Sequence, residues 1–170
     1  MVNALAPSAP DKVIAAGFDS TEIIVLSQLK QDGYAIYLEI LGGGFGASGQ
    51  GDGCDAVDSP LSNCSNVPVE AMDMEYDYFR VEDYSLVQDS GGAGRYRGGL
   101  GFQRRYHILG DGVTFATYSD RFRLAPEGLF GGADGVCAST HVLRGDEVIE
   151  LASKTSFALQ KGDILVARTG

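Results

Sequence analysis

The residues that could do chemistry gather around one glycine-rich stretch, Asp89–Gly101, in which Arg95 and Arg97 flank a tyrosine. Six of its thirteen residues are glycine. Glycine is used where the backbone adopts positive φ or where another group must approach closely. One interpretation is a hairpin connection with its bulge. The other is an anion cradle, in which backbone N–H groups and an arginine face a phosphate or carboxylate. No Gly-Lys-Ser/Thr sequence closes the stretch, so it is not a Walker loop.

Two further stretches could contribute to a site. Residues 42–53 hold seven glycines in twelve positions, with Phe45 among them. They predict either a flexible surface loop or the backbone-lined wall of a binding site, because loops of this length are usually functional or disordered. In the polar run that follows, Asn63, Asn66 and Glu70 could converge on a ligand, or they could order the loop through side-chain turns.

The composition of the chain limits its fold class, its partners and its location. The chain has 170 residues, with 44% hydrophobic and 21% charged positions, which is typical of one soluble globular domain. Its net charge of −10 argues against nucleic acid and against anionic membrane surfaces as partners. No apolar run is long enough to span a membrane. Three cysteines without a CxxC pair favour reduced thiols and a cytoplasmic location.

The elements that must position the candidates are predicted to be short strands. The glycine content, 24 of 170, places many turns between them. We expect one mainly β domain over 1–170, an antiparallel sandwich or barrel with long glycine-rich loops and one or two short helices, and an irregular segment over 1–20. The 34–41 strand is apolar almost throughout, so both of its faces are expected to be covered. The predicted strands are 22–27, 34–41, 76–87, 101–108, 113–119, 138–144, 147–151, 155–159 and 163–168, with a helix from 69 to 74.

Three of these strand pairs are predicted to be hairpins. Gln31-Asp32-Gly33 joins the first pair, and Gly145-Asp146 joins 138–144 to 147–151. Residues 160–162 are expected to join the last two strands in the same way. The strand over 76–87 mixes aromatic and polar residues and is expected to be accessible at its edge.

Spacing alone identifies no reaction. The chain has no G-x-S-x-G elbow, no H-E-x-x-H helix and no EF-hand pattern. Taken together, however, three segments in this order resemble the C-terminal part of the hydantoinase B/oxoprolinase family. They are Gly42-Gly43-Gly44-Phe45-Gly46-Ala47, the run Asn63-x-x-Asn66-x-Pro68-x-Glu70, and the Asp89–Gly101 stretch. Gly128–Gly132, Ser153-Lys154-Thr155 and Lys161-Gly162-Asp163 continue the resemblance.

That resemblance implies a role within a larger enzyme. In this family a B-type half works with an A-type half, and the pair uses ATP and a divalent metal to open cyclic amides such as hydantoins or 5-oxoproline. Related assemblies carboxylate acetone or acetophenone. The A-type half is taken to bind ATP and activate the carbonyl by phosphorylation. The resemblance thus implies an A-type subunit and an upstream B-type portion as partners, and we expect this chain itself to bind no cofactor and no metal.

Two departures from the family pattern qualify these expectations. Many relatives carry His-Thr-His-Met-Thr-Asn where this chain has Asp58-Ser59-Pro60-Leu61-Ser62-Asn63, so a metal or proton-transfer role is not carried over to that loop. A B-type half is also several times longer than 170 residues, so the chain is expected to be a fragment or separate subunit of an ATP-dependent cyclic-amide hydrolase, inactive alone. The alternative is a structural interaction module of an acetone- or acetophenone-type carboxylase complex.

The resemblance also selects candidate site residues. Asn63, Asn66 and Glu70 are candidate positioning groups for catalysis, and Arg95 and Arg121 would be anion or interface contacts. The candidate substrate-binding residues are Gly43, Gly44, Phe45, Arg95 and Arg121.

Overall fold

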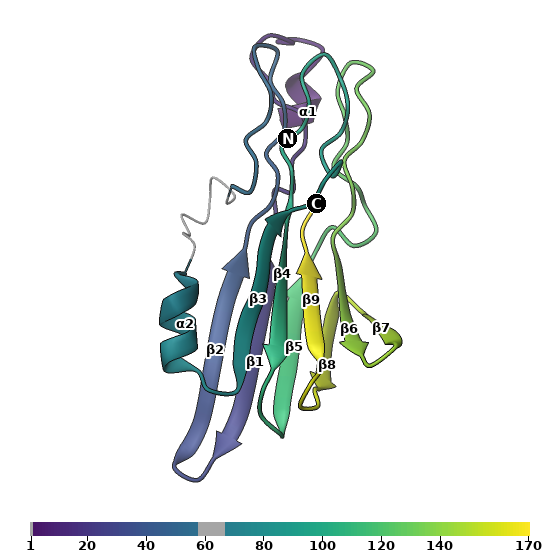
Figure 1. Cartoon of the computed structure of the whole chain (residues 1–170). Helices are drawn as coiled ribbons and strands as arrows, with labels where there is room; N and C mark the ends of the chain where they lie inside the picture. Colours follow the sequence, from purple (N-terminus) through teal and green to yellow (C-terminus); the bar gives the residue numbers. More distant parts are fainter. Residues whose placement is uncertain (1, 58–66) are drawn as a thin grey trace.

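Two antiparallel sheets packed face to face make up the chain (Figure 1). The computed structural model describes residues 2–57 and 67–170. The strands in this described part are β1 (Glu22–Lys30), β2 (Gly33–Leu41), β3 (Phe79–Leu86), β4 (Phe102–Ile108), β5 (Val113–Ser119), β6 (Ser139–Arg144), β7 (Glu147–Leu151), β8 (Lys154–Ala158) and β9 (Ile164–Arg168). Two short helices, α1 (Val2–Leu5) and α2 (Val69–Glu75), accompany them.

Several strands that follow one another in sequence lie in different sheets, β2 and β3 or β8 and β9 among them. The first sheet runs β2-β1-β5-β8 and the second runs β3-β4-β9-β6-β7. The predicted antiparallel sandwich with short helices is therefore confirmed. The described strands form no closed barrel, because each sheet keeps two edge strands. β3 is one of these edge strands, as its mixed composition predicted.

Alternating burial explains why these segments form a sandwich. In β5, Val113, Phe115 and Thr117 are buried while Thr114 and Tyr118 are exposed. Side chains of a strand point alternately to opposite faces, so one face of each sheet turns inward. The inward residues form the core. Fully buried members include Ile24, Leu26, Phe79, Tyr106, Ile108, Phe115, Val142 and Leu165.

The prediction that residues 160–162 join a hairpin is wrong. β8 pairs with β5 in the first sheet, whereas β9 lies between β4 and β6 in the second. The Leu159 N–H bonds to the Val113 carbonyl, and the Gly162 N–H bonds to the Ile108 carbonyl. The turn therefore carries the chain from one sheet to the other. Turn residues mark a reversal of direction but do not determine which strand accepts the next hydrogen bonds.

The expectation that both faces of β2 are covered is also wrong for the described chain. Its inward residues are buried, but Tyr34, Ile36 and Leu38 are 69%, 55% and 58% exposed. The outward face of β2 is thus apolar and exposed among the described residues.

The sandwich gathers its long loops at one end. Figure 1 shows them above the strands, with the β1–β2 hairpin projecting from the opposite end. Helix α2 packs beside β3 and buries Met72 in the core. Within the described residues, neither helix has the length or apolar character needed to cross a membrane.

Candidate ligand-binding site in the glycine loops

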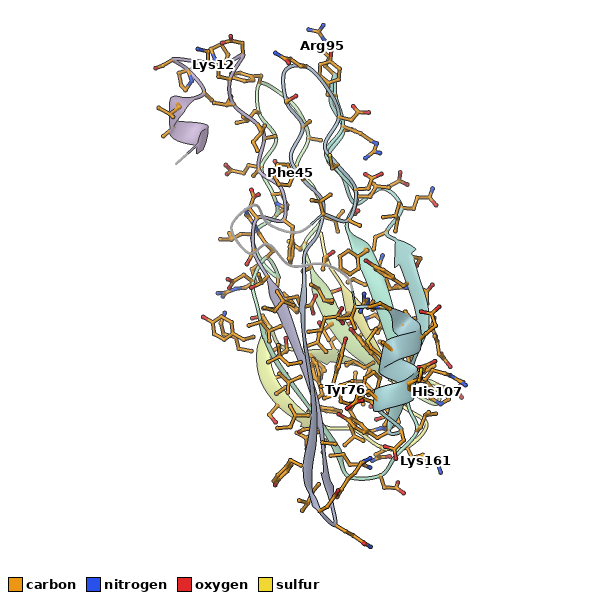
Figure 2. All side chains as sticks on the ribbon, turned by 90° about the vertical axis from the view of Figure 1, so that its left-hand side faces the viewer. Lys12, Phe45, Tyr76, Arg95, His107 and Lys161 are labelled. Carbon is orange, nitrogen blue, oxygen red and sulfur yellow. The ribbon has the colours of Figure 1, made fainter. Side chains whose placement is uncertain are left out.

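Four segments meet at the loop end of the sandwich. We name them the N-terminal segment (residues 10–18), the first glycine loop (42–55), the second glycine loop (89–101) and the third glycine loop (126–136). Figure 2 shows Lys12 and Arg95 at the tip of this end, with Phe45 nearer the sheets. Strands of both sheets supply the loops, so the rigid sandwich sets their spacing.

Backbone hydrogen bonds join the four segments in a ring. The Phe18 N–H bonds to the Gly44 carbonyl at 2.8 Å, which links the N-terminal segment to the first loop. The Gly99 N–H bonds to the Phe45 carbonyl at 2.8 Å, which links the first loop to the second. The second and third loops are joined by Ala133 N–H to the Ala93 carbonyl at 2.8 Å. Ala16 N–H to the Glu127 carbonyl at 3.3 Å closes the ring. The four segments therefore hold one another in a defined conformation through main-chain hydrogen bonds.

The glycines in this ring serve close approach. A Cβ on Gly44 would lie 2.1 Å from the Gly99 carbonyl oxygen, and one on Gly92 would lie 2.1 Å from the Ala133 carbonyl oxygen. Neither glycine has positive φ. The second glycine loop does connect the hairpin β3–β4, as one interpretation predicted. Glycine is needed at these positions because the main chain of a neighbouring segment occupies the space that a Cβ would fill.

A cavity of about 390 Å³ opens within the ring. All four segments line it, and so does Gly170. Arg95 and Glu127 are the charged side chains among its described lining residues. A concave site lined mainly by backbone and apolar groups, with few charges, has the character of a small-molecule pocket.

Both serines of the lining are already engaged in loop structure. The Ser90 hydroxyl donates to the Val87 carbonyl at 2.8 Å and accepts from the Gly101 N–H at 2.9 Å. The Ser48 hydroxyl accepts from the Gly51 N–H at 3.1 Å. Both hydroxyls therefore stabilise the wall of the cavity and are poorly placed to act as nucleophiles.

The two arginines of the second glycine loop have different environments. Arg97 binds the Asp55 carboxylate through two hydrogen bonds, and its charge is neutralised there. Arg95 is exposed, lines the cavity, and places its guanidinium 5.4 Å from the centre of the Tyr96 ring. If the site binds an anion, Arg95 is the arginine of this loop that can meet it.

The sequence-predicted residues fall into three groups. Gly44, Phe45 and Arg95 line the cavity. Gly43 and Arg121 lie outside the lining but support Phe18, which lines it: a Cβ on Gly43 would meet the Phe18 side chain at 2.5 Å, and Arg121 Nε donates to the Phe18 carbonyl at 2.9 Å.

The remaining candidates lie elsewhere. Glu70 is exposed in the first turn of α2, away from the cavity lining. Asn63 and Asn66 fall outside the described residues. Sequence reasoning missed Glu127 and the whole N-terminal segment as parts of the wall. The Pro126-Glu127-Gly128 run was interpretable only as a turn, although its repeated glycines match those of the other two loops.

The described residues do not fit a metal or ATP. They contain no group of three or more His, Cys, Asp or Glu placed to hold a metal ion. The cavity offers one cationic side chain, whereas a triphosphate is normally held by several cationic or N–H groups.

Comparison with known proteins then decides the family. The family model for hydantoinase B/oxoprolinase matches residues 1–170. The chain belongs to this family. An uncharacterized protein of Methanocaldococcus jannaschii is 38% identical over 160 residues, covering 94% of this chain and 27% of the relative. A protein of a Pseudomonas species, named as a putative B-type subunit of a D-/L-hydantoinase, is 32% identical over 156 residues, covering 91% of this chain and 26% of the relative.

Two further comparisons extend the picture. A 5-oxoprolinase of Dictyostelium discoideum is 31% identical over 134 residues, which cover 78% of this chain and 10% of that enzyme. A solved structure of nucleotide-free acetone carboxylase superposes with a TM-score of 0.75 at 15% identity, over 97% of this chain and 27% of that one. This hydantoinase B family chain thus spans about a quarter of the length of its first two relatives, and it shares its fold with part of the carboxylase.

Proposed function

We propose that this chain is the β-rich portion of the B-type part of an ATP-dependent cyclic-amide hydrolase of the hydantoinase or 5-oxoprolinase type. The observation that carries the proposal is the family match over residues 1–170. The names of two relatives, a B-type hydantoinase subunit and a 5-oxoprolinase, support hydrolysis of a cyclic amide. ATP and the divalent metal belong to the complete enzyme, with the A-type subunit and the rest of the B-type part as partners.

Within that enzyme the glycine-lined cavity holds the substrate. A small ring with amide groups needs a close-fitting wall and few charges, which is what the glycine loops provide. Phe45 offers an apolar surface, and Arg95 faces the carboxylate that the substrate carries or that ring opening releases. Gly43 and Arg121 keep Phe18 in place beneath the cavity. The role of this chain is therefore to bind and orient the substrate.

The sequence-predicted candidates outside the cavity remain part of the proposal. Asn63, Asn66 and Glu70 are proposed as positioning groups contributed from the segment between β2 and β3. Replacement of Asn66 by alanine is expected to lower turnover of the assembled enzyme, and unchanged turnover would remove this residue from the site.

A second candidate function follows from the fold comparison. The superposition on acetone carboxylase supports a structural module within a carboxylase-type complex, in which the glycine loops shape an interface and bind no substrate. The two functions differ in what the cavity does, so a variant inside the cavity separates them.

The test uses two exposed cations at the same end of the molecule. The chain is combined with an A-type subunit and the rest of a B-type polypeptide, and ATP-dependent hydrolysis of hydantoin and of 5-oxoproline is measured. Arg95→Ala, which changes the cavity, is expected to lower kcat/KM about tenfold, the cost of one charge-assisted hydrogen bond. Lys12→Ala is the control, because Lys12 is exposed at this end but does not line the cavity.

Either of two outcomes would contradict the proposal. Equal activity of both variants would favour the structural module. Absence of hydrolysis with every cyclic amide, together with ATP-dependent carboxylation of acetone, would favour the carboxylase type.

A further inference from the structure

The outward face of the first sheet departs from the usual pattern of an antiparallel sandwich. Such sheets commonly bury one face and solvate the other, so polar residues alternate with apolar ones. β1, β2 and β5 place apolar residues on both faces. The strand register sets nine apolar residues side by side on the outward face, and we name them the outer apolar face. They are Ile23, Val25, Leu29, Tyr34, Ile36, Leu38, Ile40, Ala116 and Tyr118.

No outward position of β1, β2 or β5 carries a charge, since the remaining ones are Ser27 and Thr114. On the neighbouring β8, Lys154 borders the face, with its Nζ 4.4 Å from the centre of the Tyr118 ring. The pattern is also contiguous. Val25 pairs with Leu38 on one side and with Ala116 on the other, and Leu29 pairs with Tyr34 near the hairpin tip. Several of these side chains are more than half exposed, including Tyr34, Leu38 and Tyr118.

The second sheet of the same molecule is the natural comparison. Its outward positions on β3 and β4 are largely charged or polar, whereas those on β6, β7 and β9 include Leu143, Val148, Ile164 and Val166. Gln103 and Ser85 both donate hydrogen bonds to the Asp83 carboxylate. The outward residues of this sheet include Arg80, Asp83, Ser85, Gln103, Arg105, His107, His141, Glu150 and Arg168. The outward face of the second sheet therefore carries charged residues on β3, β4, β7 and β9, whereas the outer apolar face carries none on β1, β2 or β5.

We propose that the outer apolar face packs permanently against the rest of a hydantoinase B-type polypeptide. Contiguous apolar surface on a soluble protein marks an interaction site. Interfaces that lack charge at their centre and resemble a domain core are typical of obligate partners rather than transient ones. The partner therefore presents a complementary uncharged surface to β1, β2 and β5.

The lengths of the relatives select this occupant. The chain matches only 27% and 26% of its first two relatives, so roughly three quarters of each polypeptide lies outside the match. A unit that is one quarter of a single polypeptide is covered by packing within that polypeptide. A second copy of this chain is disfavoured, because two molecules of charge −10 repel one another.

The β1–β2 hairpin shapes this surface. Its two strands have nine residues each, longer than β5 and β8, and the hairpin projects past the other strands (Figure 1). The partner thus contacts the sheet face and also the overhanging hairpin. β2 is also an edge strand of its sheet, and natural sheets usually protect or cover such edges.

The test pairs two edge-strand residues of equal exposure. The probe is the part of the Methanocaldococcus jannaschii relative outside the matched quarter, expressed as a separate polypeptide. Leu38→Glu on β2 is compared with Val148→Glu on β7, which are 58% and 57% exposed in the unpartnered chain. Placing a carboxylate in an apolar interface is expected to weaken binding at least about 30-fold for Leu38→Glu, and Val148→Glu is expected to change it less than about 3-fold.

A second measurement needs no variant. Hydroxyl-radical footprinting of the wild-type complex is expected to protect Tyr34 and Tyr118 several-fold relative to the free chain. No binding at 50 µM, no protection of these tyrosines, or equal weakening by both variants would overturn the proposal. So would a dimer of this chain alone that Leu38→Glu dissociates, or binding of an A-type subunit through this face.

The proposal rests on the proposed function only in taking a B-type polypeptide as partner. Its failure can be told from failure of that function. A complex that forms through this face but hydrolyses no cyclic amide leaves the docking surface intact and removes the function. A complex that hydrolyses the substrate while Tyr34 stays accessible supports the proposed function and removes the docking surface.

Discussion

Arg97 binds the Asp55 carboxylate in a two-pronged contact, Nη1 to Oδ1 at 2.7 Å and Nη2 to Oδ2 at 3.0 Å. Asp55 Oδ1 also accepts the Leu100 N–H at 2.8 Å, and the Arg97 N–H bonds to Asp52 at 2.9 Å. These contacts fasten the second glycine loop to the first. Because both loops line the cavity, this pair controls the distance between two of its walls.

Asp55→Asn is expected to loosen the two loops at neutral pH. The hydrogen bonds from Arg97 hold the pKa of the Asp55 carboxyl below its usual value of 3.8. A lowered folded-state pKa contributes stability above the unfolded value, and this contribution is lost as pH falls through the folded value. The thermal midpoint of Asp55→Asn should therefore lie below that of wild type at pH 7, and the gap should close below pH 3.8.

A matched control separates the contact from a general effect of charge. Asp146→Asn removes one carboxylate in the exposed β6–β7 turn and is expected to leave the midpoint unchanged. A gap for Asp55→Asn that persists at pH 2 would show that the ion pair is not its cause.

Gly44→Ala is expected to disrupt the ring of loops. Its Cβ would lie 2.1 Å from the Gly99 carbonyl oxygen, so main chain must shift on one side or the other. Overpacking of this kind costs about 1–3 kcal/mol. Chemical denaturation should report this loss in the free energy of unfolding.

Gly51→Ala serves as the comparison for that variant. Gly51 lies in the same loop, a Cβ added there would meet no other residue within 4 Å, and its φ is not positive. Its free energy of unfolding should change by less than about 0.5 kcal/mol. Equal losses for the two variants would mean that glycine serves chain flexibility in this loop and not close approach.

The sequence predicted local structure far better than long-range partners. Strands 113–119 and 147–151 were predicted with the bounds observed, because alternation and the Gly145-Asp146 turn are local signals. β8 and β9 were misassigned because a turn does not specify the receiving sheet. Glycine content predicted the loops but left open whether they are flexible or form the wall of a site, because the main-chain neighbours of Gly44 and Gly92, at Gly99 and Ala133, lie tens of residues away in sequence.

The same limit applies to charged pairs. Asp55 and Arg97 are 42 positions apart, and Glu39 and Arg104 are 65 apart, so spacing gives no sign of either contact. Within the candidate site, Phe45 and Arg95 could be chosen from the sequence because they stand out in glycine-rich stretches. Glu127 could not be chosen from the sequence, since its place in the lining depends on how the third glycine loop packs against the other segments.

Glu39→Ala is expected to destabilise the chain more than Asp55→Asn or Gly44→Ala. Glu39 and Arg104 form an ion pair in the core, where Arg104 is fully buried, and the Tyr106 hydroxyl donates to Glu39 at 3.0 Å. Removing one member leaves an unpaired buried charge, which costs about 3–5 kcal/mol. Urea denaturation measures this loss.

A double variant tests whether the unpaired buried charge causes the loss of stability. Glu39→Leu combined with Arg104→Met removes both charges and should recover much of the stability that either change alone loses. Additive losses in this cycle would show that packing, and not the unpaired charge, dominates.

Glu22 should make the stability of the chain fall as pH rises. Its side chain is buried between the sheets, where the Thr140 hydroxyl donates to Oε1 at 2.6 Å. Burial raises the pKa of this carboxyl to about 8. The folded state then keeps a proton that the unfolded state loses near pH 4.5. The free energy of unfolding is therefore expected to decrease between pH 4.5 and 8, with a slope approaching about 1.4 kcal/mol per pH unit.

Two variants check the origin of this slope. Glu22→Gln cannot titrate and should remove the slope while retaining an oxygen for Thr140. Thr140→Val removes the hydrogen bond that lowers the pKa of Glu22, so the decline should extend to higher pH. Urea denaturation at half-unit pH steps measures all three curves. If Glu22→Gln kept the wild-type slope, another buried group would have to carry the proton, and Glu22 would be ionised inside the sandwich.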